Sequence, residues 1–435
     1  MLGLRKKLEE LEKEDRPIKV CLVGAGMMGK GLVSQLLRVK GMEPSVVVSH
    51  KLEDSLKAFQ LAGIGREQIV VAKSVEDINI GMEMKRFVVT DDYTLALRAN
   101  LVDVVVDATG VPETGARIAL GAIDNRKHVV MLNVESDVVA GPYLNKLAKK
   151  AGVVYTGSAG DEPGAAMELY DFAVASGFKV LALGKGKNNP LDFYVTPDQV
   201  EEKAKASGLK PLRLASFIDG TNTMVEMAAM ANASGFIPDV RGGHGPTGTV
   251  DQLPGIYSLK EEGGILNSYG IVDFAFGVAP GVYAIITTDQ PQVHSEMRFL
   301  KMGDGPNYVL FRPYHLTSLE TPISIAKAAI YGEGSIVPKG DLPVAEVITR
   351  AKKDLKAGEH LDGIGEYTVF GSIEEYGRAK EEKLVPIGLI NDNARIKMDV
   401  KKGDFLTYDM VELDQTTEIF RLRQLQEEMA EDLTK

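Results

Sequence analysis

The chain has 435 residues, a formal net charge of −11 and one cysteine, Cys21. This acidic balance, without a long basic run, argues against nucleic acid or an anionic membrane as a main partner. One cysteine excludes an internal disulfide framework and fits a reducing compartment, and no apolar run approaches the ~20 residues that cross a bilayer. The N-terminus does not have the pattern of a signal peptide, so we expect a cytoplasmic protein.

The first part of the chain predicts strands that alternate with helices. An amphipathic helix is expected at 2–14, and apolar runs predict strands at 18–23, 45–48, 101–106, 127–132 and 152–155. Helices are expected between them at 29–40, 53–62, 92–99, 112–125 and 141–151. This alternation predicts an α/β domain, a doubly wound parallel sheet of the Rossmann type, over residues 1–155.

The remaining sequence has a different texture and predicts two further domains. Residues 156–330 predict an α+β substrate-binding domain with helices at 164–176 and 223–233, a glycine-dense loop at 239–255, and strands at 281–287 and 307–312. Residues 331–435 predict a small, mostly β domain with short strands at 366–370, 384–389, 394–398 and 405–413, closed by a helix at 416–432.

A glycine-rich turn follows the first strand. Its six residues, Gly24-Ala25-Gly26-Met27-Met28-Gly29, fit G-x-G-x-x-G between a buried strand and a helix, the context in which the motif binds a dinucleotide. Gly24 would allow the tight turn, Gly26 the approach of the pyrophosphate, and Gly29 close packing of helix on strand. The pyrophosphate would lie at the helix N-terminus, where free N–H groups favour an anion.

The end of the second strand bears on the choice of cofactor. Ser49, His50 and Lys51 stand where an acid would bind a ribose 2′-hydroxyl and repel a 2′-phosphate, so we expect NADP(H). Glu53 and Asp54 follow closely in the sequence, so the sequence leaves open which residue stands at the strand tip and whether an acid is among those that face the ribose.

Two further turns at the carboxyl ends of strands are candidates for cofactor contact. Ala108, Thr109 and Gly110 would cover the ribose or nicotinamide, and Asn133 and Glu135 would lie nearer the nicotinamide. The alternative is that these residues only shape the turns and contact no cofactor, and for Asp107 the two interpretations are about equally favoured.

The run Gly184–Pro190 predicts an anion site. Lys185, Lys187, Asn188 and Asn189 are expected on a glycine-flanked loop, where ammonium and amide groups would bind a phosphate or carboxylate. One lysine with a lowered pKa could also protonate a developing alkoxide. A solvated basic turn is the alternative.

Other candidate substrate residues come from the next two segments. Asn222 and Glu226 lie four residues apart and would share one face of a helix, where Glu226 is an acid/base candidate if it points inward and an ordinary surface residue if it does not. Arg241 and His244 would lie on a flexible loop able to close over substrate. No Cys/His metal motif exists, but carboxylates such as Asp161, Glu162, Asp219 and Glu226 offer oxygen ligands for Mg²⁺ or Mn²⁺.

Several runs resemble a known family. VCLVGAGMMG, DVVVDATG, VVMLNVES and YTGSAGDEPG resemble the homoserine dehydrogenase-like oxidoreductases, although Asn133-Val134 stands where homoserine dehydrogenases usually have Asn-Lys. GKGKNNP and DGTNTMVEM resemble a branch that carries a C-terminal SAF domain, and AKKDLKAGEHLDGIGEY with VPIGLINDNARIKMDVKKGDFLTYDMVELD resembles SAF modules. That branch includes enzymes like 1-deoxy-D-xylulose 5-phosphate reductoisomerase, which makes 2-C-methyl-D-erythritol 4-phosphate for isoprenoid biosynthesis, and D-apionate oxidoisomerase.

The resemblance implies an NADPH-dependent reductoisomerase that acts on a small sugar phosphate. The alternatives are an oxidoisomerase of a branched sugar acid, a homoserine dehydrogenase-type enzyme, and, from another class, a nucleotide-binding sensor whose SAF domain is the effector site. A homo-oligomer is expected from the frequency of oligomers among such enzymes.

Overall fold

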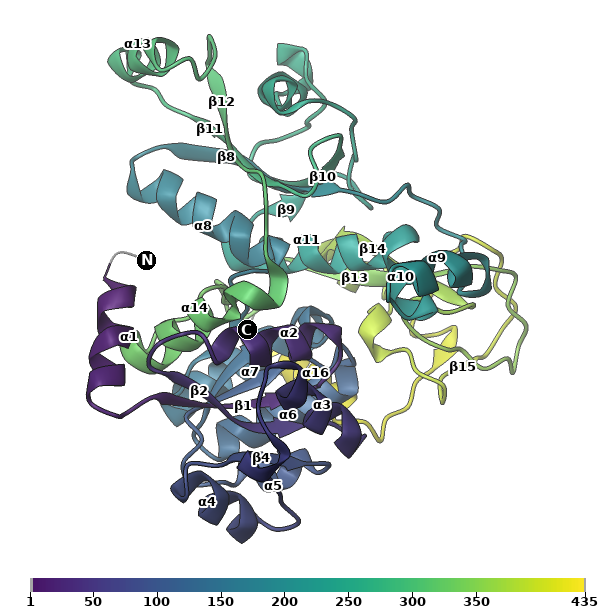
Figure 1. Cartoon of the computed structure of the whole chain (residues 1–435). Coiled ribbons are helices and arrows are strands. Elements are labelled where there is room, and N and C mark those ends of the chain that lie inside the picture. The colour runs from purple at the N-terminus through teal and green to yellow at the C-terminus, as the bar shows by residue number, and fades with distance from the viewer. Residues whose placement is uncertain (1–2, 434–435) are drawn as a thin grey trace. The chain divides into compact units, whose positions relative to one another are not determined.

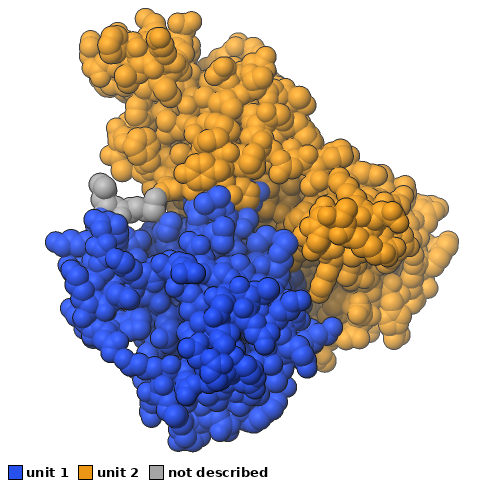
Figure 2. Space-filling view, viewed as in Figure 1, with its two compact units in different colours: residues 1–164, 316–337, 422–435 blue, residues 165–315, 338–421 orange. Residues whose placement is uncertain are grey.

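The computed structural model describes residues 3–433 and divides into two compact units, each with its own core. Unit 1 comprises residues 1–164, 316–337 and 422–435, and unit 2 comprises residues 165–315 and 338–421 (Figure 2). Each unit is therefore assembled from segments that are distant in the sequence. The predicted division of the chain into three domains stays a prediction.

Unit 1 is built on a seven-stranded sheet with the order β3-β4-β2-β1-β5-β6-β7, and every pairing in it is parallel. The central strands β1, β2 and β5 are rich in valine, and almost every residue in them is buried, which is the pattern of a parallel sheet covered by helices. Their bounds are β1 Ile18–Val23, β2 Met42–Val48, β3 Ile69–Val71, β4 Phe87–Thr90, β5 Val104–Asp107, β6 His128–Met131 and β7 Tyr155–Gly157. The predicted α/β class with a Rossmann sheet is confirmed.

The strand order of unit 1 indicates where a ligand would bind at the edge of the sheet. From β1 the chain first adds β2 and then returns to place β5 on the other side, so the order reverses between β1 and β5. A ligand binds outside the carboxyl ends of the strands at such a point. The flanking helices are α1 Leu4–Lys13, α2 Met27–Leu36, α3 Leu52–Leu61, α4 Val75–Glu83, α5 Tyr93–Leu97, α6 Pro112–Asp124, α7 Val134–Ala151 and α14 Thr321–Ala326, and α8 Glu162–Ala175 and α16 Glu418–Leu433 each run across a unit boundary (Figure 1).

Sequence reasoning missed part of this unit. The elements β3, α4 and β4 were not expected, because each strand has only three or four residues within a charged stretch. Helix α7 begins seven residues before its expected start, because Asn133 accepts a hydrogen bond from the backbone N–H of Ser136 and so caps it. Pro142 lies inside this helix and does not begin it.

Unit 2 contains a five-stranded mixed sheet with the order β12-β11-β8-β10-β9. Its strands are β8 Lys179–Lys187, β9 Ile237–Pro238, β10 Ile271–Phe276, β11 Val282–Thr287 and β12 Asn307–Arg312. The expected loop at 184–187 is wrong, because these residues form the second half of the central strand β8, between β10 and β11. Gly184 and Gly186 are needed there because the Tyr283 ring and the backbone of Ala279 lie where a Cβ would be.

Helix α11, Thr221–Ser234, is the buried helix of unit 2. Every residue in it except Asn222 is buried. It contacts β8 and β10, and it also contacts the hairpin of β13 Ala345–Ala351 and β14 Val369–Glu375, which lies alongside it in Figure 1. The other elements of this unit are α9 Glu201–Ala206, α10 Pro211–Ile218, α12 Leu253–Ile256, α13 Pro291–Phe299, α15 Tyr376–Glu381, β15 Arg395–Ile396 and β16 Val411–Glu412.

The mostly β character expected near the C-terminus is present as two small antiparallel sheets, β13–β14 and β15–β16. The structure does not test whether they form a SAF module, so that assignment stays a prediction. Among the helices of residues 3–433, none combines the length and the apolar composition that crossing a membrane requires.

Gly184→Ala should destabilise the protein. Its Cβ would lie 2.3 Å from the Tyr283 ring and 2.5 Å from the carbonyl oxygen of Asp273, and such overpacking costs about 1–3 kcal/mol. The measurement is the thermal unfolding midpoint, with Gly255→Ala as the control because a Cβ at Gly255 meets nothing within 4 Å. Equal midpoints for the two variants would contradict the tight packing described at β8.

Candidate functional site

The glycine-rich loop of unit 1 joins β1 to α2. Gly24 has a φ of +108°, and a Cβ there would lie 2.6 Å from the carbonyl oxygen of Ala108. At Gly29 a Cβ would lie 1.9 Å from the carbonyl oxygen of Gly24. Only glycine therefore fits at this position, where the helix packs against the end of the strand. A Cβ on Gly26 would meet nothing within 4 Å, which leaves an open space beside the start of α2. This is the arrangement in which a dinucleotide loop receives a pyrophosphate.

The start of α2 is accessible and has no side-chain cap. Gly26 is its N-cap residue, so the first N–H groups of the helix have no side-chain oxygen as partner from that position. Met27 and Met28 are 55% and 40% exposed. The hydroxyl oxygens of Thr317 and Ser318, also in unit 1, lie 3.5 and 3.7 Å from the Met28 sulfur and so contact the outer face of this turn.

The tip of β2 carries no free acid. Ser49 is half-buried and His50 and Lys51 are exposed. Asp54 lies in the first turn of α3, where its carboxylate accepts a hydrogen bond of 2.8 Å from Lys30 on α2. This ion pair lowers the pKa of Asp54 and joins the two helices.

The β5–α6 turn is held by side chains. Asn133 is fully buried, and its amide donates to the Asp107 carboxylate at 2.9 Å, the Thr109 hydroxyl at 3.2 Å and the Val111 carbonyl at 2.9 Å. The other carboxylate oxygen of Asp107 accepts from the backbone N–H of Thr109 at 2.9 Å. The side chain of Asn133 is therefore committed to positioning this turn, which includes Ala108 and Gly110.

Asp107 has an unusual environment for a carboxylate. Burial raises its pKa to about 6, against the lowering effect of the hydrogen bonds from Thr109 and Asn133. Glu135, in the first turn of α7, is also buried and adds a repulsive charge. The turn that carries the candidate cofactor residues Ala108, Thr109 and Gly110 therefore contains a carboxyl group, that of Asp107, with a pKa of about 6.

Unit 2 contains a cluster of buried charged residues, which we call the lysine cluster: Lys185, Lys187, Asp219, Glu226 and Lys352. Lys185 and Lys187 alternate along β8, so both project from the same face of the sheet, and each residue is only 5% exposed. Lys185 forms a buried ion pair with Glu226 of α11.

Asn222 completes the α11 side of this ion pair. Its amide donates to the second carboxylate oxygen of Glu226 at 2.5 Å, as the four-residue spacing of the two side chains predicts. Glu226 therefore points inward, which the sequence left open.

Lys187 is in a different situation from Lys185. Its ammonium group donates to the backbone carbonyl of Phe217 at 2.7 Å. Burial lowers its pKa to about 8, with a further lowering by Lys185 and an opposing effect from Glu226 and Asp219. A lysine with a pKa near 8 can exchange a proton close to physiological pH.

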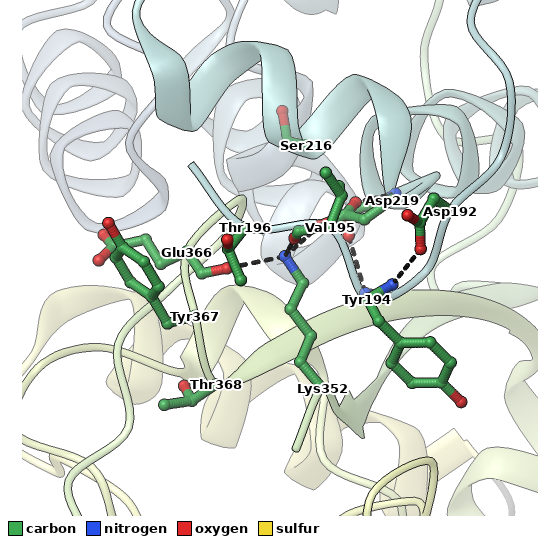
Figure 3. A network of polar contacts seen from close by, with 12 residues as sticks. Asp192, Tyr194, Val195, Thr196, Ser216, Asp219, Lys352, Glu366, Tyr367 and Thr368 are labelled. Atoms are coloured by element: carbon green, nitrogen blue, oxygen red, sulfur yellow. Dashed lines mark hydrogen bonds and ion pairs between the residues drawn. The ribbon is translucent and has the colours of Figure 1, made fainter. Parts of the chain in front are cut away.

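Asp219 and Lys352 form a second buried ion pair in the cluster, with Nζ and Oδ2 2.8 Å apart and both side chains at most 1% exposed. Lys352 also donates to the carbonyls of Val195 at 3.0 Å and Glu366 at 2.7 Å (Figure 3). Sequence reasoning missed Lys352. It directly follows β13 in a run of charged residues, where nothing distinguishes it from a surface lysine.

The remaining predicted substrate residues do not join this cluster. Asn188 and Asn189 follow β8 and are exposed and half-buried, respectively. Arg241 pairs with Glu374 of β14 and with Glu382 at 2.6 Å, and it lies 4.6 Å from the centre of the Phe405 ring. These contacts hold the loop that contains it against the C-terminal sheets.

His244 lies on the same loop and is bound at both its ring and its backbone. Its Nε2 lies 2.6 Å from Asp239, and its backbone N–H donates to Asp273 at 3.0 Å. In the described structure the loop predicted to be flexible is therefore held by ion pairs and hydrogen bonds.

The carboxylates considered as metal ligands are not gathered in unit 2. Asp219 is paired with Lys352 and Glu226 with Lys185, so neither presents a carboxylate without a counter-charge. Asp161 and Glu162 lie at the start of α8 and belong to the other unit. The lysine cluster thus does not fit Mg²⁺ or Mn²⁺, and a metal requirement stays a prediction.

Comparison with known proteins agrees with an oxidoreductase. Residues 160–321 match the family described as oxidoreductase DRL, catalytic domain, and this range contains all of the lysine cluster except Lys352. No curated protein matches the chain.

Solved structures with some likeness to the chain include three proteins described as dehydrogenases or bound to NAD. They are a probable dehydrogenase from Thermotoga maritima (13% identity, 74% of this chain and 90% of that chain, TM-score 0.41), GenD2 from gentamicin A biosynthesis in complex with NAD (14%, 75% and 90%, TM-score 0.39), and myo-inositol 2-dehydrogenase from Lactobacillus plantarum (11%, 73% and 90%, TM-score 0.37). Such low identities and scores transfer no substrate to this chain.

The family match and the dinucleotide loop together define the class of protein. Unit 1 has the Rossmann sheet with its glycine loop. The first segment of unit 2, residues 165–315, lies within the match to an oxidoreductase catalytic domain. The protein is an NAD(P)-dependent oxidoreductase.

Gly26→Ala should weaken nucleotide binding without destabilising the fold. The added methyl group occupies open space in the protein, but this is the space through which the backbone approaches a pyrophosphate. We expect the Kd for NADPH to rise about tenfold or more, measured by fluorescence titration, with the unfolding midpoint of the nucleotide-free protein unchanged.

Gly29→Ala is the contrasting variant, because its Cβ clashes with the backbone of Gly24. It should lower the unfolding midpoint as well as the affinity. Unchanged NADPH affinity in Gly26→Ala would show that the nucleotide does not use this loop.

Proposed function

We propose that the protein is an NADPH-dependent reductoisomerase that acts on a small sugar phosphate such as 1-deoxy-D-xylulose 5-phosphate. The observation that carries the proposal is the buried pair Lys185 and Lys187, of which only Lys185 is neutralised by an adjacent carboxylate. The resemblance of the sequence to the reductoisomerase-like branch supplies the type of reaction.

The charge of the lysine cluster favours an anionic substrate. Three lysines face two carboxylates, so the cluster has one positive charge in excess when all five groups are ionised. Burying such an excess is costly unless an anion or a strong hydrogen-bond acceptor compensates for it. A phosphate or carboxylate next to Lys187, with Asn188 and Asn189 as amide donors, would provide that compensation.

The proposed reaction needs proton transfer at a substrate oxygen. Isomerisation breaks one carbon–carbon bond of the ketose and forms another to give a branched aldehyde, whose carbonyl is then reduced to an alcohol. NADPH, when bound, supplies the hydride for that reduction. The ammonium group of Lys187 would give its proton to the developing alkoxide, and Asn222 and Glu226 would orient substrate hydroxyls.

The β2 tip supports NADPH as the preferred cofactor. Ser49, His50 and Lys51 offer a hydroxyl, an imidazole and an ammonium group. Of the two acids in the first turn of α3, Asp54 is paired with Lys30 and Glu53 is exposed. A 2′-phosphate would therefore meet donors and a cation at the tip of β2 itself.

Lys51→Ala should raise the Kd for NADPH about tenfold and leave the Kd for NADH nearly unchanged, because only NADPH has a 2′-phosphate to lose a charge-assisted hydrogen bond. Titration of both nucleotides measures this, with Lys57→Ala as the control that removes an exposed charge elsewhere on α3. Tighter binding of NADH than of NADPH by the unmodified protein would contradict the proposed preference.

Lys187→Met should lower NADPH consumption with 1-deoxy-D-xylulose 5-phosphate at least 100-fold, the usual contribution of a positioned acid. Because the protonated form is required, kcat/KM of the unmodified enzyme should fall as the pH rises through about 8. The assay follows NADPH absorbance with Mg²⁺ or Mn²⁺ and again with a chelator. Lys205→Met, in the exposed helix α9, is the control.

The same assay separates the alternatives. Consumption of cofactor with a branched sugar acid such as D-apionate but not with the sugar phosphate would assign the oxidoisomerase. Reduction of NADP⁺ with homoserine alone would assign a homoserine dehydrogenase. Tight NADPH binding without turnover of any of these compounds would contradict all three substrates and favour a sensor role.

A further inference from the structure

The ammonium group of Lys352 is surrounded by three oxygens from three segments of unit 2. They are the Asp219 carboxylate at 2.8 Å, the Val195 carbonyl at 3.0 Å and the Glu366 carbonyl at 2.7 Å (Figure 3). The side chain is 1% exposed. One buried ammonium thus ties the loop after β8, the α10–α11 turn and the segment before β14 to the end of β13.

The α10–α11 turn is also fixed from its other side. The second carboxylate oxygen of Asp219 accepts from the backbone N–H of Thr221 at 2.8 Å, and the Thr221 hydroxyl accepts from the N–H of Gly371 on β14 at 2.8 Å. Gly220 between them has a φ of +87°. The first turn of α11 is therefore set by Asp219, and Asp219 is neutralised by Lys352.

This first turn determines what faces β8. Asn222 is the second residue of α11, and it orients Glu226, which pairs with Lys185. A rotation of the helix start by even part of a turn would move both side chains away from the lysines, because helical residues advance 100° each.

We infer that Lys352 is a positioning residue for the lysine cluster: by pairing with Asp219 it fixes the start of α11 and sets the charge that faces Lys187. The inference rests on the proposed function only for its kinetic consequence, since the positioning itself can be measured without turnover. The family match ends at residue 321 and does not include Lys352.

The charged groups around Lys187 determine how its pKa should change when the Asp219–Lys352 pair is removed. Lys185 faces it from its own strand, Glu226 from α11 and Asp219 from the α10–α11 turn. Lys352 lies behind Asp219 and next to Glu366. Burial and the charges of Asp362 and Asp392 raise the pKa of Glu366, and Lys352 opposes that rise. Because Asp219 raises the pKa of Lys187, removing the Asp219–Lys352 pair as a unit should lower that pKa.

The test compares Lys352→Met with the double variant Lys352→Met/Asp219→Asn in the full chain. The single variant leaves Asp219 buried without its counter-ion, so its unfolding midpoint should fall. The double variant has no uncompensated charge, and Asn at position 219 can still accept from Thr221, so most of the midpoint should return.

The decisive readout is the titration of Lys187, followed by the ¹³Cε signal of labelled lysine and assigned by its absence in Lys187→Arg. We expect its midpoint near pH 8 in the unmodified protein and lower by on the order of one pH unit in the double variant. The fall of kcat/KM at high pH should shift by the same amount.

Lys339→Met is the matched control, because Lys339 donates to the Ser234 carbonyl at 3.0 Å, at the other end of α11, and no carboxylate of residues 3–433 pairs with it. It should leave the Lys187 titration where it is. An unchanged titration in the double variant would overturn the inference, even if stability changes. Failure to turn over the sugar phosphate would instead overturn the proposed function and leave the titration result valid.

Discussion

The cost of burying charge controls how unit 2 is built. A lone ionised side chain cannot be moved out of water without a partner, because several kcal/mol are lost for each ion. Lys185 and Lys352 each have a carboxylate, and both carboxylates come from α11 or from the turn just before it. The position of this helix is therefore tied to the position of the lysines, and the sheet and the hairpin on either side of it cannot slide without separating an ion pair.

The dinucleotide side of the molecule uses hydrogen bonds for the same purpose. Asn133 does not face an open space; its amide is shared among three acceptors that together shape the β5–α6 turn. Asp107 holds the same turn through the backbone N–H of Thr109. In both units the conspicuous polar residues thus act partly on the backbone, and contact with a ligand is left to the groups that these residues place at the surface of the turn.

The sequence was a good guide where one local rule decides the structure. Buried runs of valine predicted strands at the positions of β1, β2, β5, β6 and β7, although β3 and β4 were missed. Gly24, Gly26 and Gly29 predicted the loop, because strand, turn and helix follow each other directly in the chain. The four-residue spacing likewise predicted the contact between Asn222 and Glu226.

The sequence was a poor guide at Gly184–Lys187, where glycines and lysines are typical of a loop. The closeness of the Tyr283 ring and of the Ala279 backbone, distant in sequence, is what makes this segment a strand. Lys352 had no local signal at all, since its burial depends on three segments that the chain brings together only in the folded state.

The two lysines of β8 show why the folded environment, and not the residue type, divides the chemical roles. Both are buried to the same degree on the same face of one strand. Lys185 has a carboxylate within hydrogen-bonding distance, so its charge is compensated within the cluster. Among the described residues, the hydrogen-bond acceptor of Lys187 is a carbonyl and not a carboxylate. Burial, together with repulsion by the charge of Lys185, lowers the pKa of Lys187 to about 8. A group that gains and loses a proton near neutral pH suits the protonation of an alkoxide. In the proposed reaction Lys187 is therefore the residue that meets the anionic substrate and gives the proton, whereas Lys185 stays paired with Glu226. Exchanging their carboxylate and carbonyl partners would exchange these roles.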